Sequence, residues 1–327
     1  MQSNELDFFE KNDMLFLSTI AKGGYGVVYY IHSKQYDYNF ALKKIPEDMF
    51  NESEFECLKS IDDPHIVRLY KIFRYDQHVY MMMEFCSSDL NRLITKTEKI
   101  SPGALKSYIH EVILAVKACH DRNVAHSDIK PSNFLIDEHG RVKICDFGLS
   151  HMYKERPTSL NWNGTRLYMA PEIISHKKFN PIIADIWALG VTIYFMATKT
   201  YPFLSTDIQQ LIKKINCSFY DDSKIDDPQL KDLISLCLQK DITKRATVDE
   251  LLNHKFFLNS NTVDHGCTFT SRSHSVINSK NFIFKPTKDK RRHMYSDQFV
   301  CRNSSGVHIS EFYSKNHSTE TFAPALL

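Results

Sequence analysis

Three short segments of the chain carry residues whose types and spacing suit phosphoryl transfer. In chain order they are Ala21-Lys-Gly-Gly-Tyr-Gly-Val-Val28, His126-Ser-Asp-Ile-Lys-Pro-Ser-Asn133 and Asp146-Phe-Gly148. A glycine-rich turn lets backbone amides approach phosphate groups, and carboxylate and amide oxygens suit Mg²⁺. Transfer of a phosphoryl group needs a phosphate cover, a cationic anchor, metal-holding groups and a base. These segments, together with Ala41-Leu-Lys43, contain all four.

Taken together, the motifs resemble those of the eukaryotic-type serine/threonine protein kinase family. A single glycine-rich loop is a weak signal, but several motifs in this order over residues 15–257 are highly specific. The resemblance implies an α+β, bilobal protein-kinase-like fold, with a small β-rich N-lobe, a larger helical C-lobe and a C-terminal extension. It also implies ATP and Mg²⁺ as cofactors and phosphorylation of serine or threonine in protein substrates.

The glycine-rich loop lies between two strand-like runs, which is the context that a phosphate-binding loop needs. The resemblance implies that it covers the nucleotide with Ala21, Lys22, Gly23, Gly24, Tyr25, Gly26, Val27 and Val28. Gly23 and Gly26 match the second and third glycines of the family motif, whereas Ala21 replaces the first and adds a methyl group. A simple hairpin turn is the alternative interpretation.

The next strand carries two neighbouring lysines. Its period of two places Lys43 on one face with Ala41, and Lys44 on the other. By the resemblance, Ala41 and Val28 lie over the adenine while Lys43 reaches the α- and β-phosphates. We expect Lys44 to be an ordinary exposed lysine.

The family pairs this lysine with a glutamate on the helix that follows. Three glutamates compete, and counting back from the Pro64-His-Ile-Val67 segment selects Glu54 over Glu52 and Glu56. Because only 11 residues separate Lys43 from Glu54, we expect a short helix whose position depends on an activating partner or on the extensions of the chain.

Val79-Tyr-Met-Met-Met-Glu-Phe-Cys86 resembles the strand that runs into the interlobe hinge. The match implies that Met83 borders the back of the nucleotide pocket and that the backbone of Glu84 and Cys86 bonds the adenine edge. It places Asp89 where the family often has a ribose-binding acid, and it assigns Leu135 to the nucleotide site. A methionine triplet on a strand is otherwise ordinary core.

The second motif resembles the catalytic loop of the family. The resemblance makes Asp128 the group that accepts the proton of the substrate hydroxyl, and Lys130 the cation that neutralises the γ-phosphate. Lysine two residues after the aspartate is the serine/threonine form. Asn133 and Asp146 would hold the metal ion. His126 is predicted to be a packed structural residue and not a base.

Ser127 departs from the family pattern. The family commonly has arginine here, and that arginine grips a phosphorylated residue of the activation loop. Counting four back from Thr165, the usual phosphorylation site is Asn161. The chain therefore lacks both halves of this switch, which predicts activity without it, although Thr158 and Ser159 lie nearby as alternative sites.

Gly164-Thr-Arg-Leu-Tyr-Met-Ala-Pro-Glu172 resembles the peptide-docking segment of protein kinases, and Arg245 is predicted to pair with Glu172. This segment argues against a small-molecule kinase. The other alternative is a pseudokinase scaffold that binds nucleotide or partners without catalysis. Its usual sign, loss of Lys43, Asp128 or Asp146, is absent from the sequence.

Apolar periodicity predicts the elements that position these residues. Strands are expected over 15–20, 27–32, 40–45, 67–75 and 79–84, and helices over 51–59, 102–121, 182–198, 207–215, 229–239 and 247–252. We expect an N-terminal segment over 1–13 and a kinase domain over 14–257, divided into lobes at 86 and 87. Residues 258–327 form a Ser/Thr/Asn-rich tail with nine Lys/Arg against five Asp/Glu, a composition typical of mobile chain.

The composition bounds the location and partners. The chain has 327 residues, 43% of them hydrophobic, and eight scattered cysteines without a Cys-x-x-Cys pair, which indicates reduced thiols. No apolar run approaches the roughly 20 residues of a membrane span. We expect a cytoplasmic or nuclear protein that binds neither membrane nor nucleic acid. The basic run Lys285-Pro-Thr-Lys-Asp-Lys-Arg-Arg292 suits nuclear import, an acidic partner or simple solvation alike.

Overall fold

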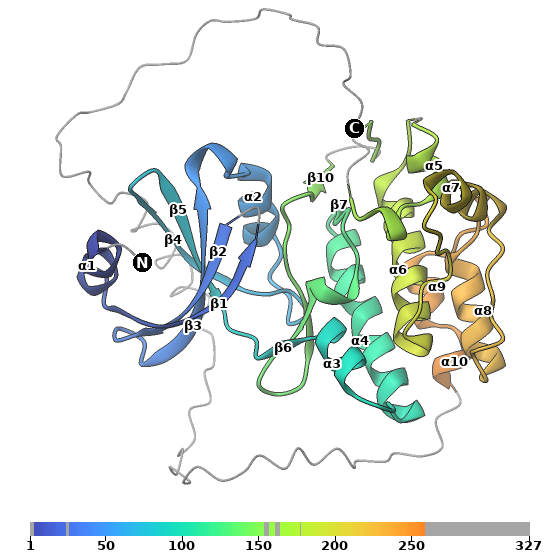
Figure 1. Ribbon diagram of the computed structural model, residues 1–327, viewed down its shortest axis with the longest axis horizontal. Coiled ribbons are helices and arrows are strands. Elements are labelled where there is room, and N and C mark those ends of the chain that lie inside the picture. The colour runs from blue at the N-terminus through green and yellow to red at the C-terminus, as the bar shows by residue number, and fades with distance from the viewer. Residues whose placement is uncertain (1–2, 24–25, 154–156, 161–163, 177, 259–327) are drawn as a thin grey trace, which may run out of the picture. The chain divides into compact units, whose positions relative to one another are not determined.

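The computed structural model of the chain describes residues 3–23, 26–153, 157–160, 164–176 and 178–258. Its N-terminal region is rich in β-structure and its C-terminal region is helical (Figure 1), which confirms the predicted fold class. The predicted tail and its basic run lie outside the described residues. The six cysteines of the described part are free thiols.

A five-stranded antiparallel sheet forms the N-terminal region. Its strands are β1 (Met14–Gly23), β2 (Gly26–Ser33), β3 (Tyr38–Pro46), β4 (Leu69–Tyr75) and β5 (His78–Glu84), in the order β1-β2-β3-β5-β4. Val28 pairs with Lys43, and Lys43 pairs in turn with Met81. Because directly opposed residues of antiparallel strands share a face, these three side chains lie on one face and Lys44 lies on the other.

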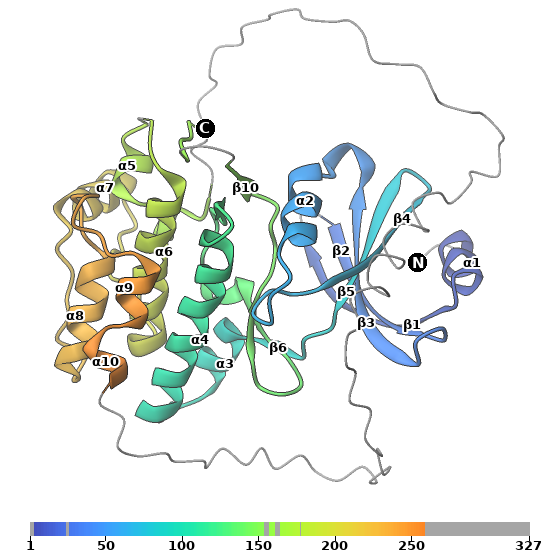
Figure 2. The ribbon, with the colours of Figure 1, turned by 180° about the vertical axis from the view of Figure 1, so that it is seen from behind.

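A helix that was not predicted covers the second face of the sheet. Helix α1 (Ser3–Lys11) places Phe8 and Phe9 in a core with residues of β1 to β5. Figure 1 and the reverse view of Figure 2 both show α1 on the opposite side of the sheet from α2 (Glu52–Ser60). The amphipathic segment escaped the prediction because it is only nine residues long and has a charged residue at almost every second position.

The helix α1 also corrects the prediction for Lys44. Its ammonium lies 2.8 Å from a carboxylate oxygen of Glu5, and the two side chains are only 20% and 8% exposed. Glu5 also accepts hydrogen bonds from the hydroxyls of Tyr29 and Tyr80. Lys44 does face away from Lys43, as predicted, but it is not an exposed lysine, because α1 covers that face.

The helix α2 is as short as the spacing predicted, at nine residues. It follows a 3₁₀ turn, η1 (Glu47–Met49). The side chain of Asn51 caps its first turn by accepting a hydrogen bond from the amide of Ser53. Cys57 and Leu58 anchor the helix in a second, larger core that extends into the helical region.

The helices of the C-terminal region begin where the sequence offers capping residues. Ser101, Asn180, Asp207, Asp227 and Thr247 each accept a hydrogen bond from the first turn of a helix. The helices are α3 (Leu90–Lys96), α4 (Pro102–His120), α5 (Pro171–Ile174), α6 (Pro181–Thr198), α7 (Ile208–Cys217), α8 (Pro228–Cys237), α9 (Val248–Leu252) and α10 (Lys255–Leu258). The short helices α3, α5 and α10 were not predicted.

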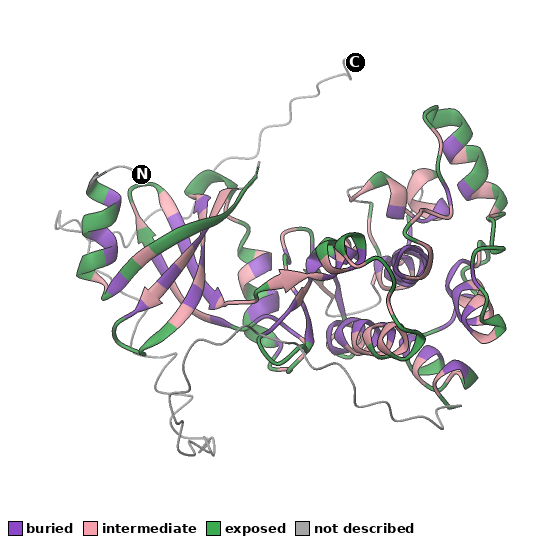
Figure 3. Cartoon of the chain, turned by 60° about the horizontal axis from the view of Figure 1, so that its bottom comes forward, coloured by how far each residue is buried: buried purple, intermediate pink, exposed green. Residues whose placement is uncertain are grey.

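The helix α6 is apolar on all sides because it forms the centre of this region. By length and composition alone, α6 could cross a membrane, although the sequence predicted no apolar run of that length. However, 78% of this helix is buried inside the protein. That burial is typical of the core helix of a folded domain. Figure 3 shows buried residues along the sheet and on the inner sides of the helices, with exposed residues at the periphery.

Short elements between the long helices hold the loops that carry the motifs. A three-stranded sheet contains β6 (Ser88–Asp89), β8 (Phe134–Ile136) and β9 (Val142–Ile144), and a second pair joins β10 (His151–Met152) to β7 (Val124–Ala125). The 3₁₀ turns are η2 (Pro131–Asn133) and η3 (Arg166–Tyr168). These strands fix both ends of the catalytic loop and of the Asp146-Phe-Gly148 segment.

Candidate active site

Lys43 binds two carboxylates that come from distant parts of the chain. Its ammonium lies 2.6 Å from Glu54 of α2 and 3.1 Å from Asp146. Burial lowers the pKa of Lys43, but the two carboxylates outweigh it and raise the pKa above its usual value. The glutamate chosen from the sequence is therefore the one that meets the lysine, whereas Glu52 and Glu56 are exposed.

The glycine-rich loop connects β1 and β2, and Gly23 pairs with Gly26 at its base. Gly26 has a φ of +139°, and an added Cβ would lie 2.0 Å from the backbone oxygen of Lys44, so only glycine fits there. Ala21 and Lys22 lie near the end of β1, opposite Val28 and Val27. Gly24 and Tyr25 lie outside the described residues.

The predicted hinge follows β5. Met83 is buried and pairs with Ala41, so the two share the face of Lys43. Glu84 turns its carboxylate to Lys143, 3.1 Å away. Burial raises the pKa of the half-buried Cys86 thiol to about 12.

Two further residues assigned to the nucleotide site have local structural contacts. Asp89 caps α3 by accepting a hydrogen bond from the amide of Arg92 at 2.9 Å. This contact uses one carboxylate oxygen of the residue predicted to bind ribose. Leu135 lies on β8, opposite Asp89 of β6, and is half-buried.

Asp128 lies at the centre of the catalytic loop and has three side-chain partners. Lys130 lies 2.7 Å from one carboxylate oxygen, Thr165 donates to the other at 2.9 Å, and Asn133 donates at 3.1 Å. Burial raises the pKa of the Asp128 carboxyl, but these partners outweigh it, Lys130 most strongly, so the pKa lies below its usual value. Asp128 is therefore ionised near neutral pH.

Asn133 and Asp146 offer oxygen atoms that suit a magnesium ion. The amide nitrogen of Asn133 donates to Asp128, so its side-chain oxygen is the atom that could bind a metal ion. Asp146 binds Lys43 through one of its two oxygens. Asp146 has a φ of 63°, a backbone conformation that few residues other than glycine adopt. Among the described residues no cluster of three His, Cys, Asp or Glu could hold a metal. Two protein oxygens fit Mg²⁺, which takes its other ligands from phosphate and water.

A buried carboxylate fixes the catalytic loop from below; the sequence predicted a helix over 182–198 that contains this residue but assigned its side chain no role. Asp185 of α6 is 2% exposed and accepts hydrogen bonds from the backbone amides of His126 and Ser127, at 2.7 and 2.8 Å. His126 is fully buried with its ring 5.0 Å from that of Phe147, as expected of a structural histidine. The available signal was an aspartate inside an otherwise apolar helix, since a buried charge needs partners.

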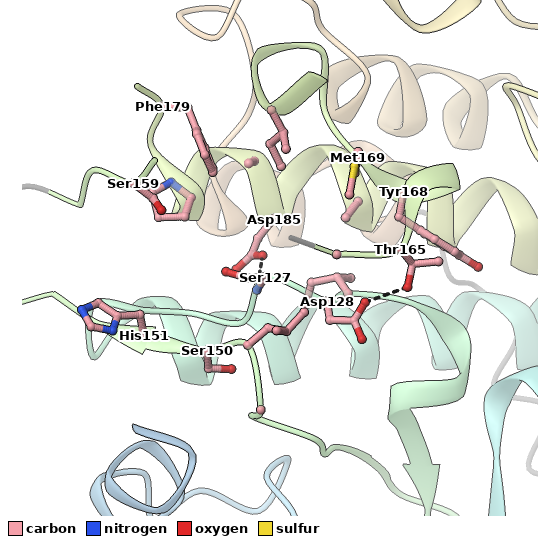
Figure 4. A pocket seen from close by; sticks show the side chains of 18 of the residues that line it. Ser127, Asp128, Ser150, His151, Ser159, Thr165, Tyr168, Met169, Phe179 and Asp185 are labelled. Atoms are coloured by element: carbon pink, nitrogen blue, oxygen red, sulfur yellow. Dashed lines mark hydrogen bonds between the residues drawn. The ribbon is translucent and has the colours of Figure 1, made fainter. Parts of the chain in front are cut away.

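Ser127 lines a pocket of about 290 Å³ between the catalytic loop, the start of α2 and the activation segment (Figure 4). None of the described residues that line it is lysine or arginine, and His151 is the basic side chain among them. Ser159 lines the pocket too, and its backbone pairs with Phe179. Thr158 is exposed, and Asn161 lies outside the described residues.

The predicted ion pair beneath the peptide-docking segment is present. Arg245 binds both oxygens of Glu172, at 2.6 and 3.1 Å, and its guanidinium lies 5.3 Å from the Trp187 ring. The guanidinium is buried, so this bidentate pair ties the start of α5 to the turn before α9.

The sequence reasoning missed three further residues of the site. Thr165 bonds both Asp128 and Lys130. Lys143 is 5% exposed and donates to the Pro64 carbonyl in addition to binding Glu84. Asn51 donates to the carbonyl of Gly148. Their residue types are ordinary for their positions, so only their partners reveal them.

Comparison with known proteins identifies the family of this fold. Residues 15–257 match the protein kinase domain. The chain belongs to the protein kinase domain family.

Several curated relatives are kinases by name, and one of them is named a serine/threonine-protein kinase. The chain is 31% identical over 251 residues to NUAK family SNF1-like kinase 2 of Homo sapiens, which covers 73% of this chain and 39% of the relative. It is 33% identical over 211 residues to CBL-interacting serine/threonine-protein kinase 8 of Arabidopsis thaliana, with coverage of 64% and 47%. The carbon catabolite-derepressing protein kinase of Saccharomyces cerevisiae is 29% identical over 249 residues, with coverage of 74% and 39%. The chain thus spans less than half the length of these relatives.

Proposed function

We propose that the chain is an active serine/threonine protein kinase that transfers the γ-phosphoryl group of ATP to a protein hydroxyl. The observation that carries this proposal is a pair of side-chain clusters, Lys43 with Glu54 and Asp146, and Asp128 with Lys130 and Thr165. The relative named CBL-interacting serine/threonine-protein kinase 8 supports the same class of substrate.

Each cluster has a separate chemical task. Lys43, held by Glu54, offers a fixed cation to the nucleotide phosphates, and the glycine-rich loop offers its backbone amides. Asp128 is ionised and can orient the substrate hydroxyl and accept its proton. Lys130 places a cation beside that aspartate to offset charge on the transferred group. Bound Mg²⁺, held by Asn133 and Asp146, would neutralise phosphate charge.

The rival function is a pseudokinase scaffold that binds without catalysis. Lys43 forms ion pairs with Glu54 at 2.6 Å and with Asp146 at 3.1 Å. This arrangement favours catalysis over the scaffold function, because binding without catalysis does not require these ion pairs. The two functions differ in one measurement, which is phosphate transfer to a peptide.

The proposed activity does not depend on an arginine-bound phosphate in the activation segment. Ser127 occupies the position of the arginine, and no lysine or arginine is present among the described residues that line the pocket beside it. A buried arginine without a phosphate would leave an unpaired charge, which costs free energy until phosphorylation relieves it. Serine imposes no such cost.

The test is phosphorylation of a peptide array by bacterially expressed, phosphatase-treated protein, with mass spectrometry to verify that phosphate is absent. We expect the treated protein to phosphorylate serine or threonine and to retain most of the rate of the untreated protein. Asp128→Ala should abolish it while the protein stays folded. Transfer that persists in Asp128→Ala would refute the assignment of the base. Transfer that collapses after phosphatase treatment and returns with phosphate on Thr158 or Ser159 would refute the independence from phosphorylation.

A further inference from the structure

Asn51 makes two hydrogen bonds that join the start of α2 to the metal-binding segment. Its side-chain oxygen accepts from the Ser53 amide at 2.9 Å, and its side-chain nitrogen donates to the Gly148 carbonyl at 2.9 Å. Only one orientation of the amide satisfies both partners, because the oxygen can only accept and the nitrogen can only donate. The same side chain therefore caps the helix and holds the third residue of Asp146-Phe-Gly148.

These contacts close a ring of interactions around the phosphate site. Asn51 binds Gly148, which follows Asp146 by two residues, Asp146 binds Lys43, and Lys43 binds Glu54 one turn along α2 from Asn51. The ring is compact, since a Cβ added to Gly148 would lie 3.6 Å from an oxygen of Asp146 and 3.8 Å from one of Glu54.

We propose that Asn51 is a positioning residue that holds α2 and the Asp146-Phe-Gly148 segment together, and so keeps Lys43, Glu54 and Asp146 in register without a phosphate. The inference rests on the proposed function and adds the internal link that stands in for the missing switch. It also explains how the short helix α2 keeps its position. The sequence alone predicts that this position depends on an activating partner or on the extensions of the chain. Asn51, Ser127 and Gly148 line one pocket, so the neutral link lies where the chain lacks an arginine.

Loosening this link has a specific kinetic consequence. If only a fraction of molecules hold Lys43 and Asp146 in register, the apparent affinity for MgATP equals the intrinsic affinity multiplied by that fraction. Peptide docking on the segment 164–172 does not change. A single hydrogen bond at this exposure supports an effect of about three- to tenfold. We therefore expect the KM for MgATP to rise while the KM for peptide stays constant.

Three variants separate the link from the helix cap. Asn51→Asp keeps the capping oxygen but replaces the donor with an acceptor. Asn51→Ser keeps a capping oxygen without added charge and is too short to span both partners. Asn180→Asp is the matched control, because Asn180 caps α6 through the same type of oxygen, accepting from Ile182 and Ile183.

The experiment measures kcat and both KM values, calorimetric affinity for MgADP, thermal unfolding, and hydrogen–deuterium exchange of peptides covering 52–60 and 146–150. Both Asn51 variants should raise the KM for MgATP, weaken MgADP binding by about three- to tenfold, and speed exchange in both peptides at an unchanged Tm. The Asn180→Asp protein should match the wild type.

Wild-type nucleotide affinity and exchange in both Asn51 variants would overturn the inference. A lower kcat and Tm with unchanged KM values would also overturn it, because this pattern indicates a cap alone. An effect confined to Asn51→Asp would trace the change to the added charge and would likewise refute it. If the wild-type protein transfers no phosphate, the proposed function fails, and MgADP binding and exchange still decide the role of Asn51.

Discussion

Two neighbouring lysines of β3 have different partners because the strand turns them to opposite faces. Lys43 reaches Glu54 and Asp146 on the face toward the helical region, whereas Lys44 reaches Glu5 under α1. Both are partly buried ion pairs, and such pairs shape local structure more than they add net stability. Because the ion pairs of Lys43 and Lys44 lie on opposite faces of the sheet, we expect the two lysines to have separate roles.

Substitution of each lysine by methionine should separate catalysis from stability. We expect Lys43→Met to lower kcat/KM for ATP by about 10²-fold or more, because a fixed cation at the phosphates is lost. Lys44→Met should keep peptide phosphorylation but lose ~1–3 kcal/mol of unfolding free energy, since Glu5 loses a charged partner. Peptide kinetics and urea unfolding of both variants give the comparison, and a Lys44→Met protein that is stable but inactive would contradict it.

Among the elements, α1 forms a second layer that covers one face of the N-terminal sheet. Phe8 stacks on Tyr75 with ring centroids 4.5 Å apart, and Phe9 is 1% exposed. Glu5 is a buried charged residue within this apolar layer. Burial raises the pKa of its carboxyl, but the hydrogen bonds from Lys44, Tyr80 and Tyr29 outweigh it and lower the pKa below its ordinary value of 4.5.

The lowered pKa of Glu5 predicts a pH dependence of stability. A group whose pKa is lower in the folded protein stabilises it above its unfolded pKa, and this contribution is lost as the pH falls through the folded pKa. The stability difference between wild type and Glu5→Gln should therefore be largest above about pH 4.5 and shrink below it. Urea unfolding from pH 7 to pH 3 measures it, with the exposed Glu10→Gln on the same helix as control. A difference that is constant with pH would exclude the ionised Glu5.

At the scale of the whole molecule, the chain contains more than the segment that the family match covers. The match begins at residue 15, whereas α1 ends at Lys11, so the match leaves the helix out. The domain boundary predicted from the sequence, between residues 13 and 14, stays a prediction. This boundary would separate α1 from the sheet face that the helix covers. The tail and the basic run considered for nuclear import lie outside the described part, and the cytoplasmic or nuclear location stays a prediction.

Two truncated chains test which residues the domain needs. A chain of residues 1–258 should fold and phosphorylate peptide at a rate close to that of the full chain, because all proposed site residues precede 258. A chain of residues 15–258 should lose ~3–6 kcal/mol of unfolding free energy, since two phenylalanine side chains leave the core at ~1.5–3 kcal/mol each. Equal melting temperatures for these two chains would show that α1 adds nothing to the fold.

The motifs, their order and most of the long elements could be predicted from the residues alone. Glycine-rich and Asp-Phe-Gly segments are recognisable locally, because backbone conformation and metal chemistry restrict the residue types there. Predicted strands and long helices agree with the structure to within a few residues at each end, since alternation and capping are also local signals.

Which residues meet across the chain could be learned only from the folded molecule. Glu5 and Lys44 are 39 residues apart, Asn51 and Gly148 are 97, and Asp185 lies 58 residues from Ser127. An isolated segment carries no signal for such pairs, because the burial of a charge or amide depends on what covers it. The partner of Lys44, the role of α1 and the link made by Asn51 are therefore properties of packing and not of spacing.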